Sequence, residues 1–179
     1  MSKNVLVIST SPRQNGNSET LATTFAQGAQ DAGHSVEVIR LHDKKIGFCI
    51  GCLTCQKTKH CIIHDDADMI VQKMLTAEVI AFATPVYFYE MSGQMKTMLD
   101  RTNPLYPADY AFRDIYLLAT AAEEEESAMD GTVRGLQGWL RCFEKTSLKG
   151  VIRGTGVFDV GDMKGHPALQ EAYELGKAL

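Results

Sequence analysis

The sequence lacks a long apolar run and a surplus of basic residues, and we expect no N-terminal signal peptide. No uninterrupted apolar stretch approaches the roughly 20 residues that a membrane-spanning helix needs. The first four residues run directly into the apolar segment 5–8, which is too early and too strand-like for a signal peptide. With 18 Lys and Arg against 22 Asp and Glu, the net charge is −4, without the clustered basic surface of nucleic-acid-binding proteins. We therefore expect a cytoplasmic protein that binds neither a membrane nor nucleic acid.

Cysteine is also scarce, and it is unevenly distributed. Of the five cysteines, four fall within residues 49–61 and Cys142 stands alone. In a cytoplasmic chain, clustered cysteines indicate metal or redox chemistry before structural disulfides. Cys142 lies beside Leu140 and Phe143 in an apolar segment, so we expect it in the core.

Five short apolar runs recur along the chain, with segments of helical character between them. Continuous apolar runs are typical of strands buried on both faces of a parallel sheet. The expected strands cover residues 5–9, 36–41, 79–83, 115–120 and 150–157. The expected helices cover residues 18–32, 66–75, 91–99, 129–143 and 167–179, with Ser18 as the first N-cap and Gly33 as the first terminator. This alternation predicts a single α/β domain over residues 1–179, with helices on both faces of the sheet.

The expected strand order places the binding chemistry at one edge of the sheet. In such sheets, ligands bind beyond the carboxyl ends of the strands, where the strand order reverses. For a five-stranded sheet of order 2-1-3-4-5, that point lies between the first and third strands. The loops after these two strands should therefore carry the site, with help from the loop after the fourth.

The loop after the first strand has the composition of an anion site. Residues 9–18 read Ser-Thr-Ser-Pro-Arg-Gln-Asn-Gly-Asn-Ser and lead straight into a helix, whose free N–H groups favour negative charge. The Gly-x-Gly-x-x-Gly of a dinucleotide loop and the Gly-Lys-Ser/Thr of a P-loop are both absent. So are the acidic residues of a phosphorelay receiver and the cysteine of a phosphatase loop. A hydroxyl-rich loop suits a terminal monophosphate, whereas the alternative is an ordinary polar turn capped by a serine.

Two segments resemble the NAD(P)H-dependent FMN reductases. Residues 11–18 are similar to that family's phosphate loop, Gly-Ser-Pro-Arg-x-x-Gly-Asn-Thr. Residues 84–101 are similar to its Ser/Thr-Pro-Val-Tyr-x-x-x-x-Ser-Gly-x-x-Lys segment, which ends in Asp-Arg. The resemblance implies a flavodoxin-like three-layer sandwich, with a five-stranded parallel sheet of order 2-1-3-4-5 and FMN at the edge of strands one, three and four.

The resemblance and the loop positions together define an expected set of FMN-binding residues. For the phosphate loop the set is Ser9, Ser11, Arg13, Asn15, Asn17 and Ser18. For the flavin ring it is Thr84, Pro85, Val86, Tyr87, Phe88, Thr120, Ala121 and Ala122. Physically, a proline stiffens the third loop and Tyr87 offers a rigid amphipathic ring. Directly after this set comes the acidic run 123–126, which we expect to be the solvated start of a helix.

The cysteine cluster predicts a second centre. The spacing is Cys49-x-x-Cys52-x-x-Cys55-x-x-x-x-x-Cys61, and four thiolates within 13 residues can hold a 4Fe–4S cluster. The pattern resembles that of the iron–sulfur flavoproteins, a branch of the same family. Two alternatives remain open. The first is a zinc site with His60 and His64 as spare ligands, and the second is a loop of free or partly oxidised thiols.

The expected function is that of an FMN-dependent oxidoreductase. It would transfer hydride or electrons from NAD(P)H to a small acceptor such as a quinone or a flavin. Because the cofactor carries the chemistry in such enzymes, no protein side chain is assigned as a catalytic acid or base. The alternatives are an electron carrier without its own NAD(P)H turnover and a cofactor-free interaction module.

The resemblance also implies a homodimer or homotetramer, in which a neighbouring subunit helps to cover the flavin. The apolar residues that we expect at such an interface are Tyr89, Met91, Met95 and Trp139.

Overall fold

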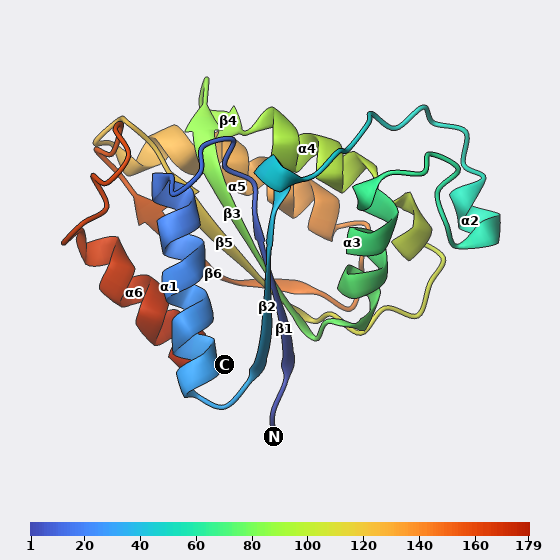
Figure 1. The fold of residues 1–179 in the computed structure, drawn as a ribbon, viewed down its shortest axis with the longest axis horizontal. Coiled ribbons are helices and arrows are strands. Elements are labelled where there is room, and N and C mark those ends of the chain that lie inside the picture. The colour runs from blue at the N-terminus through green and yellow to red at the C-terminus, as the bar shows by residue number, and fades with distance from the viewer.

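Five parallel strands form the centre of the protein, which a computed structural model describes over all 179 residues (Figure 1). They lie in the order β2-β1-β3-β5-β6, and each neighbouring pair is parallel. The strands are β1 (Asn4–Ser9), β2 (Ser35–Arg40), β3 (Val79–Tyr87), β5 (Asp114–Thr120) and β6 (Ser147–Gly154). Counted along the chain, the parallel strands therefore have the predicted order 2-1-3-4-5, and the predicted α/β fold is confirmed.

A sixth, two-residue strand was not predicted. β4 (Glu90–Met91) pairs antiparallel with the end of β3 through a tight hairpin. The two residues at its tip, Phe88 and Tyr89, have positive φ angles of 51° and 62°, as two-residue hairpin turns require. The helix that we expected to begin at Met91 therefore begins later, as α4 (Gly93–Asp100), with Ser92 as its N-cap.

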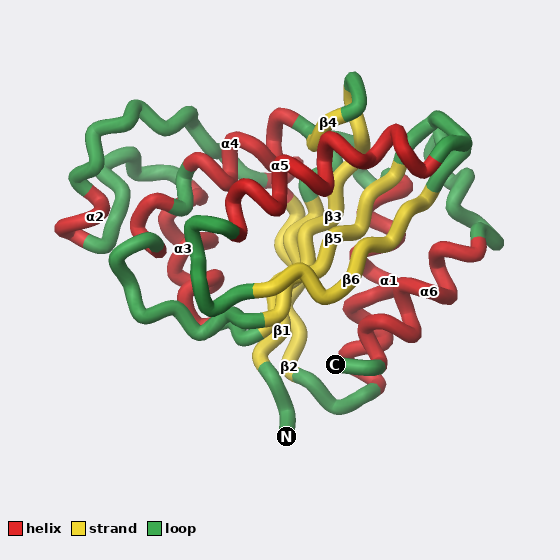
Figure 2. Tube along the Cα trace, turned by 180° about the vertical axis from the view of Figure 1, so that it is seen from behind, coloured by secondary structure: helices red, strands yellow, loops and turns green.

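Helices cover both faces of the sheet (Figures 1 and 2). One face carries α1 (Asn17–Asp31) and α6 (Pro167–Lys177), and the other carries α3 (Asp66–Thr76), α4 and α5 (Asp130–Leu140). Side chains of β1 alternate between the two hydrophobic cores. Val5 and Val7 belong to the core beneath α1 and α6, whereas Leu6 and Ile8 belong to the other. This double burial is the reason that the strands read as continuous apolar runs.

Two helix boundaries correct the sequence-based expectations. α1 begins at Asn17 with Gly16 as its N-cap, so Ser18 lies in the first turn and does not cap the helix. Gly33, with a φ of 87°, follows the end of α1 as predicted. α5 is shorter than expected, because the chain leaves the helix after Leu140. None of the helices combines the length and the apolar character that crossing a membrane would require.

Candidate functional site

A cavity lies beyond the carboxyl ends of β1, β3, β5 and β6. Four loops contribute to it, and three of them are the predicted ones. The predicted residues that line it are Ser11, Arg13, Asn17, Ser18, Pro85, Val86, Tyr87, Thr120, Ala121 and Ala122. Gly16 lines it as well, and the fourth loop contributes Val157 and Phe158.

The first loop holds buried polar atoms that have no partner within the chain. The hydroxyls of Ser9 and Ser18 are buried, with residue exposures of 0% and 1%, and neither forms a hydrogen bond. The side-chain oxygen of Asn17 is also buried and unpartnered. Because such groups cost about 1–3 kcal/mol each when left unsatisfied, they indicate a polar ligand. Hydroxyls beside a helix N-terminus suit an anion such as a phosphate.

The only arginine of the first loop contacts the fourth loop. Arg13 Nη1 donates to the backbone oxygen of Phe158 at 2.8 Å, and its guanidinium carbon lies 5.9 Å from the centre of the Phe158 ring. Asn17 Nδ2 donates to the backbone oxygen of Asp159 at 2.9 Å. Asp162 orders this loop by accepting bonds from the amides of residues 158 and 159, at 2.9 and 2.7 Å. The fourth loop is therefore joined to the phosphate loop.

Val157 and Phe158 are site residues that the sequence reasoning missed. They lie in a segment beyond the two family-like motifs, so no motif pointed to them. One available signal was the group of glycines around them, because Gly156, Gly161 and Gly165 all adopt positive φ angles, of 66°, 102° and 77°. Glycines so spaced are typical of an irregular loop.

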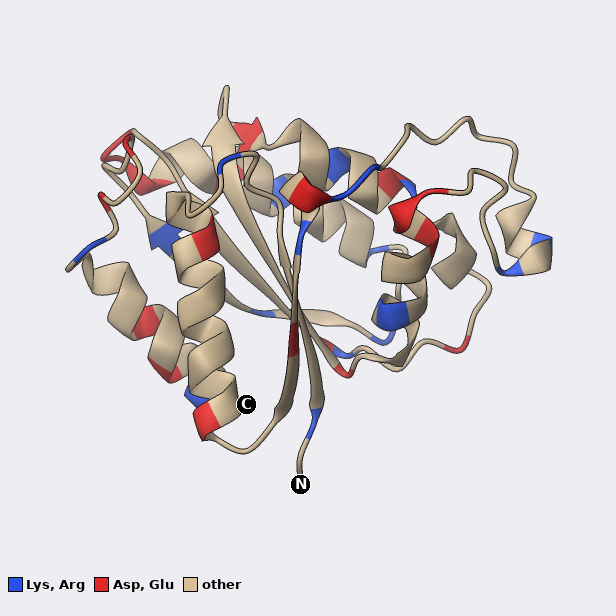
Figure 3. Cartoon of the chain, in the orientation of Figure 1, with Lys and Arg blue, Asp and Glu red and all other residues tan.

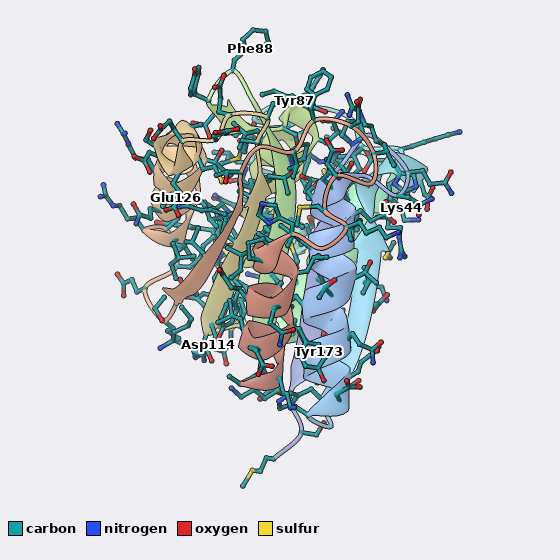
Figure 4. The ribbon with its side chains drawn as sticks, turned by 90° about the vertical axis from the view of Figure 1, so that its left-hand side faces the viewer. Lys44, Tyr87, Phe88, Asp114, Glu126 and Tyr173 are labelled. Carbon is teal, nitrogen blue, oxygen red and sulfur yellow. The ribbon has the colours of Figure 1, made fainter.

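Four of the predicted FMN-binding residues do not line the cavity. Ser9 is buried behind it, and Asn15 is exposed at a turn where its amide donates to Glu19 Oε2 at 2.8 Å. Thr84 is buried within a hydrogen-bond network. Phe88 is fully exposed at the hairpin tip and points away from the protein (Figure 4).

The network around Thr84 connects the first and third loops. Thr10 Oγ1 donates to the backbone oxygen of Ala83 at 2.9 Å and lies 3.0 Å from Ser92 Oγ. The amide of Ser92 in turn donates to Thr84 Oγ1 at 3.1 Å. All three hydroxyl residues are buried. Thr84 thus positions the third loop from behind, and Ser92 links both loops to the start of α4.

The acidic run after β5 is exposed, as expected for a solvated helix approach. Figure 3 shows these acidic residues at the same end of the protein as the first loop. Glu126 opens a short 3₁₀ helix (Glu126–Met129) that leads into α5. Arg153 lies 3.7 Å from Glu126 and 3.3 Å from Asp130, so this cation is already paired. Arg13 is the only cation that lines the cavity.

The four clustered cysteines lie in a loop at the far edge of the protein, beside α2 (Cys55–Thr58) and opposite α6 (Figures 1 and 2). All are free thiols. Cys49 and Cys52 are exposed, Cys61 is half-buried and Cys55 is buried. Burial raises the pKa of Cys55, and the charges of the other three thiols raise this pKa further. The pKa of Cys52 is lowered by hydrogen bonds from the Thr54 backbone and side chain.

Four cysteine thiols are the ligands that a 4Fe–4S cluster needs, but their sulfurs are not positioned to bind one in this structure. All three other thiols lie near enough to Cys55 to act on its pKa. No group of three or more His, Cys, Asp or Glu side chains is arranged as a metal site in this conformation. His60, a spare ligand in the zinc alternative, has its Nδ1 atom 2.8 Å from Asp68 Oδ2. A cluster would therefore have to draw the four sulfurs together.

A buried arginine ties both ends of this loop to the rest of the protein. Arg101, the residue after α4, is 2% exposed. Its Nη1 donates to Gly47 O and Asp65 Oδ2, both at 2.7 Å. Its Nη2 donates to Asp65 Oδ1 at 2.8 Å, and to Ile63 O and Cys61 Sγ, both at 3.3 Å. Burial alone would lower the pKa of Arg101, but the hydrogen bonds to Asp65 and Cys61 outweigh it and raise the pKa.

Three further expectations are wrong. Cys142 is exposed rather than in the core, because it follows the end of α5. Met91 and Met95, expected at a subunit interface, are 7% and 0% exposed because they pack into the core of this chain. Tyr89 remains available, with 62% exposure, and Trp139 packs partly against the core.

Comparisons with known proteins agree with the fold and with the family resemblance. Residues 3–153 match the model of the NADPH-dependent FMN reductase family. An iron–sulfur flavoprotein of Methanocaldococcus jannaschii is 41% identical over 101 residues, which are 56% of this chain and 52% of that protein. The chain thus spans about half the length of this relative.

Solved structures with the same fold are more distant in sequence. The NAD(P)H:quinone oxidoreductase from Methanothermobacter marburgensis has a TM-score of 0.70 at 18% identity, covering 99% of this chain and 98% of that one. A flavodoxin from the domain Archaea has a TM-score of 0.60 at 17% identity, covering 98% and 94%. At these identities the likeness establishes a flavodoxin-like fold.

Proposed function

The chain belongs to the NADPH-dependent FMN reductase family, and we propose that it is an oxidoreductase that holds FMN in the cavity at the strand ends. It would transfer hydride or electrons from NAD(P)H to a small acceptor such as a quinone or a flavin. The observation that carries this proposal is the buried, unpartnered hydroxyl of Ser18, which lines the cavity in the first turn of α1. A phosphate at this helix end would accept a hydrogen bond from it.

The residues around the cavity divide into two roles in this proposal. Ser11, Asn17 and Ser18 would hold the phosphate together with Arg13, whose guanidinium is the only cation in the lining, whereas Ser9 lies outside the lining. The backbone of residues 85–87 and 120–122 would face the flavin ring, with Tyr87 as a flat apolar surface. FMN supplies the redox chemistry, and the chain supplies orientation and exclusion of water.

The cysteine loop is proposed to hold a 4Fe–4S cluster through Cys49, Cys52, Cys55 and Cys61. Two observations support this. The four thiols are free and belong to one loop, and the relative from M. jannaschii is named an iron–sulfur flavoprotein. A bound cluster would supply one-electron chemistry in addition to that of the flavin, and its four metal–sulfur bonds would order the loop.

The proposed assembly is a homodimer or homotetramer, as in the family that the sequence resembles. Tyr89 and the fully exposed Phe88 leave an apolar hairpin tip next to the cavity. Large exposed aromatic side chains are enriched at protein interfaces. Light scattering of the FMN-loaded protein at micromolar concentration tests this, and a monomer would contradict it.

A ligand comparison tests the FMN assignment. Wild-type protein is titrated with FMN and with riboflavin, which lacks the phosphate, alongside Ser18→Ala and the exposed control Ser127→Ala. We expect Ser18→Ala to weaken FMN binding, to leave riboflavin binding unchanged and to differ from the control. Equal effects on both ligands would contradict a phosphate role for Ser18.

A turnover assay then distinguishes the enzyme from an electron carrier. The FMN-loaded protein is mixed with NADH or NADPH and a water-soluble quinone, and the absorbance of the reduced nicotinamide is followed. Multiple turnovers per chain are expected. A bound flavin that can be reduced chemically, but not by either nicotinamide, would instead identify an electron carrier.

A further inference from the structure

We propose that Arg101 is a positioning residue of the cysteine cluster, which fixes Cys61 relative to the flavin cavity and sets how readily the bound cluster is reduced. The inference rests on the proposed 4Fe–4S cluster. Arg101 does not line the cavity, and Cys61 is the one cysteine of the four that it contacts.

The first argument is the way in which the guanidinium closes the loop. Gly47 lies two residues before the first cysteine, and Asp65 lies four residues after the last. Arg101 bonds to both, and it reinforces a direct contact between the two ends, in which the Gly47 amide donates to Asp65 Oδ2 at 2.7 Å. Its contact with Asp65 is bidentate, which requires the planar fork of arginine and which lysine cannot reproduce.

The second argument is the contact with sulfur. Arg101 Nη2 lies 3.3 Å from Cys61 Sγ, so a charged donor points at a proposed cluster ligand. Hydrogen bonds and positive charge at the cysteine sulfurs stabilise the reduced, more negative state of a cluster and so raise its reduction potential. This effect is strong here because Arg101 is almost fully buried.

The third argument is the helix that carries Arg101. Ser92, the N-cap of α4, bonds to Thr10 and Thr84 behind the cavity, and Arg101, the residue after α4, bonds to the cysteine loop. Eight helical residues span about 12 Å. The helix therefore connects the two proposed redox centres rigidly, with a buried polar contact at each end.

The experiment compares variants that change charge in opposite directions. Wild type, Arg101→Gln, Asp65→Asn and the exposed control Arg134→Gln are purified without oxygen with FMN bound. Iron per chain, FMN per chain and the cluster's reduction potential are measured. Arg101→Gln removes the positive charge beside Cys61, so it should keep FMN and lower the equilibrium constant for reduction about tenfold, or about 59 mV for one electron. Asp65→Asn removes a negative charge beside Cys61 and should shift the potential in the positive direction.

The outcomes separate this inference from the cluster assignment. Unchanged potentials in both variants, or shifts of the same sign, would overturn the inference. A purely structural role of Arg101 does not predict potential shifts of opposite sign in the two variants. Wild-type protein without iron would refute the cluster instead. The anchoring role is then decided by hydrogen exchange of residues 47–65, which must increase in Arg101→Gln and not in Arg134→Gln. Unchanged exchange would overturn it.

Discussion

The cavity at the strand ends and the cysteine loop are held in place by different means. Around the cavity, Thr10, Thr84 and Ser92 form a buried hydrogen-bond network, and the loops leave directly from paired strands. The cysteine loop, residues 44–65, contains a single four-residue helix and is bonded to Arg101 at both of its ends. A site on rigid elements is preorganised, whereas a loop with little structure of its own takes order from what it binds.

The largest difference between the two regions should appear when a cysteine is replaced. We expect anaerobically purified protein to carry about four irons per chain. Cys55→Ser removes the buried thiol of the four, so it should abolish most of the iron while FMN stays bound. The matched control is Cys142→Ser, which removes an exposed cysteine outside the cluster. Iron and flavin analysis measures both variants. Full flavin without iron in the wild type would mean that the loop holds only free thiols.

The next largest effect is expected from the buried ion pair that anchors the loop. Asp65 and Arg101 have side-chain exposures of 11% and 1%. Asp65→Ala would leave a buried guanidinium without its carboxylate, which typically costs about 3–5 kcal/mol. The control is Lys96→Ala, which breaks an exposed pair with Asp100 and should cost less than about 1 kcal/mol. Urea unfolding measures both free energies, and similar values for the two variants would contradict the anchoring role.

The same pair predicts a loss of stability in acid. Burial alone would raise the pKa of Asp65, but hydrogen bonds from Arg101 and from the amides of Gly47 and Ala67 outweigh it, so the pKa is lowered. A carboxyl with a lowered folded pKa stabilises the protein fully above its unfolded pKa, about 3.9, and loses this contribution as the pH falls towards the folded value. The free-energy difference between wild type and Asp65→Asn should therefore be constant from pH 7 to about 5 and shrink below about 4. A constant difference down to pH 2 would contradict this.

The sequence predicted the two regions unequally well. The sheet order and three of the four cavity loops follow from periodicity and position, because parallel strands must bring their carboxyl ends to one edge. Phe88 was placed in the site by motif position alone. Its backbone lies in a hairpin turn with positive φ, a conformation that nothing in its side chain favours, so the ring points outwards.

The anchoring of the cysteine loop could not be predicted from local pattern. Arg101 was visible only as the end of a family-like motif, and Asp65 only as a residue before a helix. Their pairing joins residues 36 positions apart. Likewise, the contact between Arg13 and Phe158 joins residues 145 positions apart. Its acceptor is a backbone oxygen, and every residue has one, so the amino-acid sequence does not indicate this contact.

At the preorganised cavity, the expected effects are on affinity rather than on folding. Arg13→Ala should weaken FMN binding by about 1.5–3 kcal/mol, the value of a hydrogen bond to a charged group. Riboflavin binding should be nearly unchanged, because riboflavin lacks the phosphate. Fluorescence titration measures both ligands, with Arg134→Ala as an exposed control. A loss of equal size for riboflavin would remove the phosphate role from Arg13.

The smallest effect is expected at the fourth loop. The Phe158 ring is 66% exposed and lies under the Arg13 guanidinium, a contact worth about 0.5–1 kcal/mol at exposed sites. Phe158→Ala keeps the backbone oxygen that accepts from Arg13, so only the ring contact is lost. FMN affinity should fall by no more than about 1 kcal/mol. In an Arg13→Ala background the same change should have no effect, because the ring acts through that guanidinium. A double-mutant cycle of FMN binding tests this, and additive losses would instead mean that Phe158 contacts the flavin directly.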